Sequence, residues 1–495
     1  MRKINKKDLI IYTITFVITC LIFLPLLTGH YASDSYNIYN IGYHDYAIKY
    51  SLNDGRVFMA ILGLIANKVN ISIDVYIFIT LFLALLISNI TVMTLNKIIK
   101  KYKKPQNIFQ EIIVIIISYI TVFNFMYLEN MYFVECVVMA ISVLLFILSA
   151  NILVEKNNKY FIKSSILTIL GVMFYQGTIG MFLAFVFLFT ILKNENNVKQ
   201  MIIDLIKCGI IAGIGVLADL LIVKIVGYVL NMNQSRYGSL YNISKNILYI
   251  FSELLTIMKE NCGLFPKNVL FIFLSILTII IIIYQSRNTN KIDNTLYKYL
   301  LIMFITIASS FVIHLTTLAS FYTGRLKNSL GALVGIIFIF LYVETNLLEN
   351  KGKLSKVTIL TLLTFAIINM FNYENIILQH KETNKLEKEE IQNVEEYIEQ
   401  YEERTGIKVT KIVKIPINGN RTKGYFTSTK NRSIFTHNSM RVYWAADGMV
   451  NMYTKRNLEL VKITIEQKEY YENNHDEQRG YECIDDILYL DTYIN

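Results

Sequence analysis

Long apolar runs separated by short polar segments make up the first 373 residues of the chain. A run of about 20 apolar residues is typical of a membrane-spanning helix, which satisfies its own backbone hydrogen bonds inside a bilayer. Together with the basic residues that flank the runs, the pattern predicts about eleven crossings. The expected crossings lie near residues 9–28, 72–95, 109–126, 131–153, 160–175, 177–193, 200–230, 266–285, 297–319, 329–348 and 355–373.

The first long polar interruption, HYASDSYNIYNIGYHDYAIKYSLNDGRVF, covers residues 30–58. The apolar stretch after it, residues 57–69, is too short to span, and a crossing there would break the alternation of the helices. A stretch of this length is more typical of an interfacial or re-entrant segment. We therefore expect residues 29–71 to form one loop on the outer face of the membrane, termed the first loop below.

The pattern changes after residue 373. A charged segment with a helical pattern comes first, and residues 408–417, KVTKIVKIPI, then alternate as a strand does. A tyrosine-rich tail follows and contains the only tryptophan, Trp444. We expect two parts: a transmembrane domain, 1–373, and a small α/β domain, 374–495, of about 120 residues with a modest core of its own.

Composition and charge agree with a polytopic α-helical membrane protein. Of the 495 residues, 54% are hydrophobic and 17% are charged, whereas about a quarter of the residues are charged in soluble domains. The formal charge of +10 does not indicate nucleic acid as a partner, because the Lys and Arg residues gather at the ends of the apolar runs. If these clusters face the cytoplasm, the N-terminus is cytoplasmic and the region after residue 373 is extracytoplasmic. The 5 Cys show neither a disulfide framework nor metal-ligand spacing.

Asp34 follows the first crossing by a few residues. It is either a turn or cap acid or a general base. A carboxylate that is partly desolvated at a membrane surface binds a proton more readily than one in water, which suits a base. Further along the first loop, Asp54-Gly55-Arg56 predicts a tight turn, after which Arg56 is able to hold a phosphate with its forked guanidinium.

Other polar residues are expected on the same outer face as Asp34 and are candidates for binding an anionic substrate. Glu135 and His314 carry more weight than surface charges, because ionisable groups at membrane depth are costly; each is also explained by local pairing. No Gly-rich phosphate loop is present, which argues against a soluble nucleotide-sugar donor. The complete set of candidate substrate-binding residues is Asp54, Arg56, His44, Asp45, Glu129, Glu135, Tyr175, Gln176, Arg236, His314, Arg325 and Lys327.

Ser33-Asp34-Ser35-Tyr36, the Asn53-Asp54-Gly55-Arg56 element and the Tyr175-Gln176-Gly177 break together resemble the GtrII family of glucosyltransferases, most clearly over roughly the first 350 residues. The resemblance implies a GT-C-type fold in the plasma membrane. It also implies transfer of a hexose, with glucose as the first choice, from a polyprenyl-phosphate sugar to a surface glycan at the outer face, with inversion. By position the role of base falls on Asp34. The family often has an acidic pair there, so the lone Asp34 leaves a divalent cation open as a cofactor.

Two other functions fit a polytopic chain that handles lipid-linked sugars. A polymerase or ligase is disfavoured because the late outer loops are short. A flippase or transporter needs polar residues along a path through the membrane, whereas most of the polar groups in this chain gather at one face.

Overall fold

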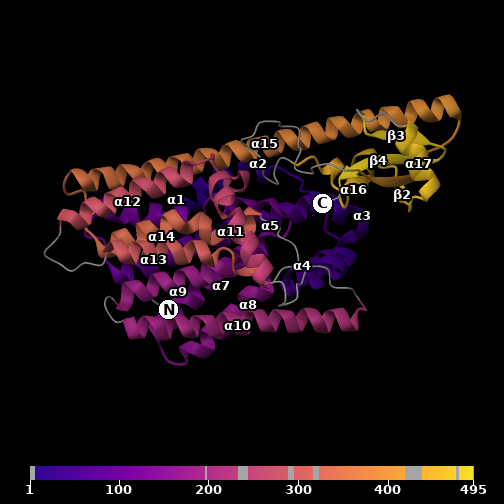
Figure 1. Ribbon diagram of the computed structural model, residues 1–495. Coiled ribbons are helices and arrows are strands. Elements are labelled where there is room, and N and C mark those ends of the chain that lie inside the picture. The colour runs from indigo at the N-terminus through magenta and orange to yellow at the C-terminus, as the bar shows by residue number, and fades with distance from the viewer. Residues whose placement is uncertain are drawn as a thin grey trace.

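The computed structural model describes residues 6–194, 198–231, 243–287, 295–315, 323–417, 437–474 and 479–493. A bundle of roughly parallel helices forms most of the molecule, and one very long helix, α15, extends from the bundle to a small sheet (Figure 1). The elements up to the middle of the bundle are α1 (Lys6–Ile22), α2 (Leu24–Leu27), α3 (Ser33–Tyr46), η1 (Ala47–Leu52), α4 (Val57–Val69), α5 (Ile73–Tyr102), α6 (Ile108–Val122), η2 (Tyr127–Tyr132), α7 (Cys136–Glu155), α8 (Tyr160–Tyr175), η3 (Gln176–Thr178) and α9 (Ile179–Asn194).

The remaining elements complete the bundle and then build the sheet. They are α10 (Val198–Val229), α11 (Ile243–Glu260), η5 (Asn261–Gly263), α12 (Val269–Arg287), α13 (Thr295–Ser309), η6 (Val312–Leu315), η7 (Gly324–Leu326), α14 (Asn328–Glu344), α15 (Lys353–Thr405), β1 (Lys411–Ile417), η9 (Ser439–Arg441), α16 (Ala446–Thr454), β2 (Glu459–Leu460), α17 (Ile465–Asn474), β3 (Tyr481–Ile484) and β4 (Ile487–Tyr493).

Several helices are long and apolar enough to cross a membrane. Among the described residues there are six such segments, with residues 160–193 counted as one, and five shorter apolar helices accompany them. The protein is therefore a helical, membrane-embedded protein, as the apolar pattern predicts, while the number of eleven crossings stays a prediction. The six segments are Ile73–Tyr102, Cys136–Glu155, Tyr160–Lys193, Lys199–Val229, Val269–Arg287 and Lys353–Thr405.

Helix α14 is the centre of the bundle and is buried along nearly its whole length. It packs against α6, α9 and α13. Two glycines allow the close approach to α6: a Cβ at Gly331 would overlap the side chain of Asn124, and one at Gly335 would overlap Thr121. The helix is apolar on all sides, which is typical of a helix surrounded by others.

Ion pairs join the loops at one end of the bundle, termed the basic end. Lys100 pairs with Glu111, Lys103 with Glu349, Lys156 with Asp204 and Lys298 with Glu344. Helix α8 starts at this end, just after α7, and Lys193 in the last turn of α9 returns to the Val154 carbonyl of α7. The chain therefore reverses between α8 and α9, and the predicted break at Tyr175-Gln176-Gly177 lies at the opposite end.

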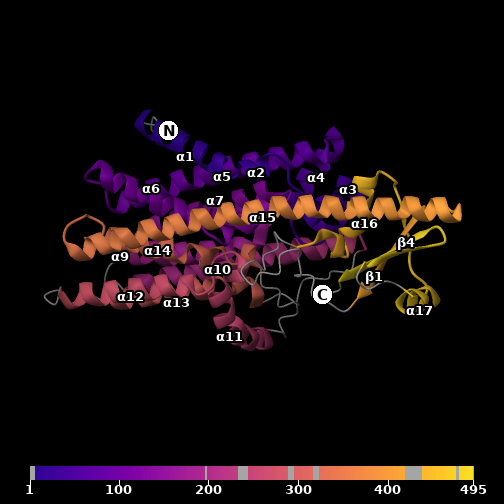
Figure 2. The same ribbon diagram turned by 90° about the horizontal axis from the view of Figure 1, so that it is seen from above.

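The C-terminal region, defined as residues 406–495, contains a four-stranded sheet in the order β2-β1-β4-β3. Strand β1 is parallel to β2 and β4, and β3 is antiparallel to β4. Seen from above, α15 runs past the bundle and reaches this sheet, and α16 lies beside α3 (Figure 2). Helix α15 passes without a break through the expected domain boundary at residue 374, so the charged helical segment and the last apolar run form one helix.

Much of the first loop is helical. Residues 33–46 and 47–52 are helical, as α3 and η1, with a kink in α3 at Gly42, where φ is +79. Helix α4 has the bounds expected for the interfacial segment. Helix α3 has no apolar stripe of the usual kind, because its buried face is partly polar: Ser35, Tyr36, Asn37 and Ile38 are buried. The crossing expected near residues 200–230 corresponds to the single unbroken helix α10, Val198–Val229.

Candidate active site

Asp34 lies in the first turn of α3, at the end of the bundle opposite the basic end. A carboxylate is favoured there by the helix dipole. The hydroxyl of Tyr132 fixes the start of the helix by accepting the Ser33 backbone N–H at 3.2 Å. The carboxylate itself is half-buried, and its Oδ1 accepts a hydrogen bond from the indole Nε1 of Trp444 at 3.2 Å.

A second carboxyl group, that of Glu135, comes close to Asp34 at the start of α7. Its side chain is buried, with the residue 2% exposed. Burial, and then the negative charge of Asp34, raise the pKa of Glu135 to about 8, although Arg56 and a hydrogen bond with Tyr46 act in the opposite direction. At neutral pH Glu135 therefore keeps its proton. We refer to Asp34, Tyr46, Arg56 and Glu135 as the Asp34 cluster.

Arg56 enters this cluster from the tight turn before α4. The turn forms as expected, and Gly55 has φ +77, a conformation that favours glycine. The guanidinium lies 3.5 Å from the Asp54 carboxylate and 5.5 Å from the centroid of the Tyr175 ring. Its side chain is 17% exposed, and its Nε has no hydrogen-bond partner among the described residues. The guanidinium charge is therefore largely shielded from water, and its Nε–H remains available to a hydrogen-bond acceptor.

A second group of ionisable residues gathers where η2, η6 and η7 meet, and we call Glu129, His314, Arg325 and Lys327 the Lys327 cluster. Glu129 accepts the Gly324 N–H at 2.7 Å. The Lys327 ammonium donates to the Thr323 carbonyl at 3.2 Å and lies 3.4 Å from Nε2 of His314. The Arg325 guanidinium stacks 4.1 Å from the centroid of the Phe133 ring.

The electrostatics of the Lys327 cluster follow from burial. Desolvation lowers the pKa of Lys327 to about 8, although Glu129 nearby opposes the shift. It lowers the pKa of His314 to about 2, with the Lys327 charge acting in the same direction, so this imidazole is neutral. Burial also raises the pKa of Glu129, against the attraction of Arg325 and Lys327. A bound anion would therefore stabilise the buried cations of this cluster.

Two short segments join the clusters. Segment η3 contacts residues next to both clusters, because Gln176 donates from Nε2 to the Asp54 carbonyl at 2.8 Å, and a Cβ at Gly177 would overlap Leu326 of η7. The stretch from Glu129 to Glu135 also joins the clusters, because Glu129 belongs to the Lys327 cluster and Glu135 to the Asp34 cluster. The glycine of the Tyr175-Gln176-Gly177 break is thus required for the close approach.

The structure brings most of the candidate residues into the two clusters or next to them. The exceptions are His44 and Asp45, whose side chains are 62% and 42% exposed on α3. They interact with each other and with Lys49, since Asp45 accepts the Lys49 ammonium at 2.6 Å. They join neither cluster, because they lie on the outward side of the helix. Arg236 lies outside the described residues.

Three residues of the site were not among the candidates: Tyr46, Tyr132 and Trp444. Tyr46 is signalled only by the abundance of tyrosine in the first loop, and Trp444 only by being the single tryptophan. Tyr132 lies outside that loop and has no signal of this kind. The pairing of Asp34 with Glu135 also went unseen, because 100 residues separate the two acids along the chain. No group of three or more His, Cys, Asp or Glu side chains that could hold a metal ion occurs in the described ranges.

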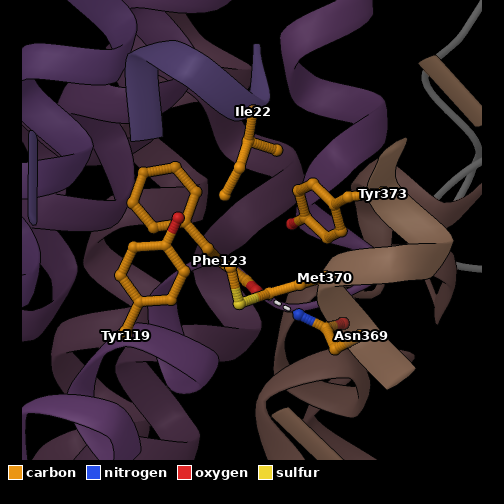
Figure 3. A pocket seen from close by; sticks show the side chains of 6 residues that line it. All are labelled: Ile22, Tyr119, Phe123, Asn369, Met370 and Tyr373. Carbon is orange, nitrogen blue, oxygen red and sulfur yellow. Dashed lines mark hydrogen bonds between the residues drawn. The ribbon is translucent and has the colours of Figure 1, made fainter. Parts of the chain in front are cut away.

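A separate small pocket lies between α1, α6 and α15. Its lining is mainly aromatic and apolar, and Asn369 donates to the Phe123 carbonyl at its edge (Figure 3). None of its lining residues belongs to either cluster, so it is not part of the candidate site. The lining residues are Ile22, Tyr119, Phe123, Asn369, Met370 and Tyr373.

The family model described as glucosyl transferase GtrII matches residues 23–343, more than half of the chain. The chain belongs to the GtrII glucosyltransferase family. The match contains both clusters and ends before α15, so α15 and the C-terminal region lie outside it. No curated protein matches the chain. Family membership and the apolar helices together make the protein a membrane glucosyltransferase, as the resemblance implies.

Proposed function

We propose that this GtrII family member transfers a hexose, with glucose as the first choice, from a polyprenyl-phosphate sugar to a cell-surface glycan. The observation that carries the proposal is the meeting of carboxyl groups and buried cations at one end of an apolar bundle. A lipid-linked donor needs such an arrangement, since its chain lies in the bilayer while its phosphate and sugar lie at the surface. The GT-C type of fold is part of this proposal.

Asp34 is the proposed general base. In a direct displacement, a hydroxyl oxygen of the acceptor attacks the anomeric carbon as its proton passes to the Asp34 carboxylate. The bond between that carbon and the phosphate oxygen breaks, and its electron pair leaves with the polyprenyl phosphate. The anomeric configuration is inverted. Glu135, protonated at neutral pH, adds no second negative charge beside the base.

The leaving phosphate is the proposed ligand of the cations in both clusters. Arg56 and Arg325 each have an Nε without a hydrogen-bond partner within the described part of the chain, so each has a donor left to offer. Lys327 adds a buried positive charge next to Arg325. Donors fixed in a dry site stabilise developing negative charge more than they would in water. The phosphate therefore needs no proton to leave.

The orientation in the plasma membrane is proposed from the charge pattern. The basic end faces the cytoplasm, the N-terminus is cytoplasmic, and the clusters and the C-terminal region lie outside. Helix α4 lies along the outer interface and guides the lipid chain: Ile61, Ile65 and Val69 recur on one exposed side, and Met59 and Ala60 are buried.

Transfer and transport are separated by reconstituting the purified protein in liposomes that contain polyprenyl-phosphate [14C]glucose, with acceptor glycan outside. The proposal expects label in the glycan and an inverted anomeric linkage by NMR. Lipid-linked label that changes leaflet without entering the glycan would replace the proposal with a transporter. In a parallel sample that also contains lipid-linked repeat units, glycan chains lengthened by those units would replace it with a polymerase or ligase.

A further inference from the structure

The C-terminal region packs directly onto the helix that carries Asp34. Helix α16 lies against α3, and the two backbones come so close that a Cβ at Gly448 would overlap the carbonyl oxygen of Tyr36. Buried hydrophobic side chains from both sides form one core, among them Tyr36, Ile38, Met449 and Val450. The contact is therefore a packed interface rather than an incidental touch.

Polar contacts fix the register of the two helices. Asn40 of α3 donates to the Asp447 carboxylate at 2.7 Å and accepts from Asn451 at 3.1 Å. Asp447 also pairs with Lys414 of β1 at 2.9 Å, which ties the interface to the sheet. Because these groups are buried and directional, α16 has one preferred position on α3.

A buried carboxyl group anchors the first turn of α3, close to Asp34 in the sequence. Glu387 of α15 accepts the Tyr36 hydroxyl at 3.1 Å and the Ser439 backbone N–H at 2.7 Å. It therefore joins three elements at one point: α15, α3 and η9. The short segment between η9 and α16 is therefore fixed at both ends, by the Glu387 contact with η9 and by the packing of α16 on α3. Trp444 lies in this segment.

We propose that Trp444 is a positioning residue for the transfer reaction: its indole N–H holds one oxygen of Asp34, so that the other oxygen faces the acceptor hydroxyl. The inference rests on the proposed role of Asp34 as base. It follows from the 3.2 Å bond between Nε1 and Oδ1 and from the interface that fixes the indole. Since the family match ends at residue 343, this chain completes its site with a residue from outside the matched region.

The N–H donor has a defined effect on the base. An indole nitrogen donates and cannot accept, so it stabilises the ionised form of the carboxylate that it contacts. The other titratable or charged groups around Asp34 are Tyr46, Arg56, Tyr132 and Glu135. Removal of the donor therefore shifts the acid limb of the pH profile of transfer to higher pH.

The test compares Trp444→Phe with wild-type protein in the liposome assay, with Tyr443→Phe as the control at the neighbouring exposed aromatic residue. We expect kcat to fall about ten-fold, as for loss of one hydrogen bond to a charged group, with little change in the KM for the lipid donor. We expect the acid limb to move to higher pH, also in a Glu135→Gln background, where the second carboxyl group is gone. Tyr443→Phe should leave both quantities unchanged.

A second variant tests the docking without touching the indole. Gly448→Ala should push α16 away from α3 and lower kcat in the same way, whereas Gly213→Ala, where a Cβ meets nothing within 4 Å, should not. If Trp444→Phe keeps the wild-type kcat while Asp34→Asn is inactive, this inference is wrong and the proposed function stands. A lower kcat without a shifted acid limb assigns Trp444 to packing alone and also overturns the inference. Full activity of Asp34→Asn removes the base on which both proposals rest.

Discussion

Replacing Glu135 by Gln should stabilise the protein at neutral pH. The unfolded carboxyl group ionises above its usual pKa of 4.5, whereas burial keeps the folded one protonated up to about pH 8. Folding therefore takes up a proton between these values. The contribution of Glu135 to stability is complete below pH 4.5 and is lost as the pH rises towards 8.

The size of the stabilisation by Gln follows from the pH interval between 4.5 and about 8. Each pH unit above 4.5 costs the folded wild-type protein about 1.4 kcal/mol, so the loss is about 3 kcal/mol at pH 7. Gln has nearly the same shape and does not titrate. It should therefore recover up to that amount at pH 7 and nothing at pH 4.5.

Thermal unfolding in detergent micelles, followed by the loss of the helical circular dichroism signal, measures this difference at every pH in the window. The midpoint of Glu135→Gln should equal that of wild type near pH 4.5 and exceed it increasingly towards pH 8. Glu155→Gln, at the opposite end of α7, is the matched control. A midpoint difference that stays constant with pH, or a less stable Glu135→Gln at pH 7, would show that burial does not keep Glu135 protonated in the folded protein.

The other predictions concern the second cluster and the bundle. Lys327 loses its charge near pH 8, so wild-type transfer should decline above that pH as phosphate binding weakens; Lys327→Arg should keep its charge and extend activity to higher pH, and an identical alkaline limb in both proteins would contradict this. Gly331→Ala should lower the free energy of unfolding by about 1–3 kcal/mol, because its Cβ overlaps Asn124, while Gly209→Ala, which meets nothing, should not; equal unfolding midpoints would contradict it.

Local pattern alone predicts much of the bundle. The apolar runs mark the membrane helices, and the polar break at Tyr175-Gln176-Gly177 marks the reversal between α8 and α9. The bounds of α4 and the strand at β1 also agree with the pattern. In each case the structure is set by neighbours in the sequence, which a single chain displays directly.

Contacts between distant segments are not visible in this way. The first loop reads as a polar coil, yet α3 is helical because its partly polar buried face packs against α16, residues that lie far along the chain. Asp34 reads as a lone acid because Glu135 and Trp444 reach it only in the folded protein. His44 and Arg56 both lie in the first loop, and burial separates them: Arg56 is largely buried in the Asp34 cluster, whereas His44 is exposed. The roles of the site residues and the division of the chain at residue 374 stay predictions.

The central claim is that Asp34 accepts the proton of the acceptor hydroxyl. Its most direct test is the rate of hexose transfer from polyprenyl-phosphate glucose by the Asp34→Asn variant of the full chain in liposomes, beside Asp45→Asn as the control on the exposed side of the same helix. The account predicts that kcat falls about a hundred-fold or more in Asp34→Asn, with donor binding retained, and that it is unchanged in Asp45→Asn. Transfer at the wild-type rate by Asp34→Asn would contradict it.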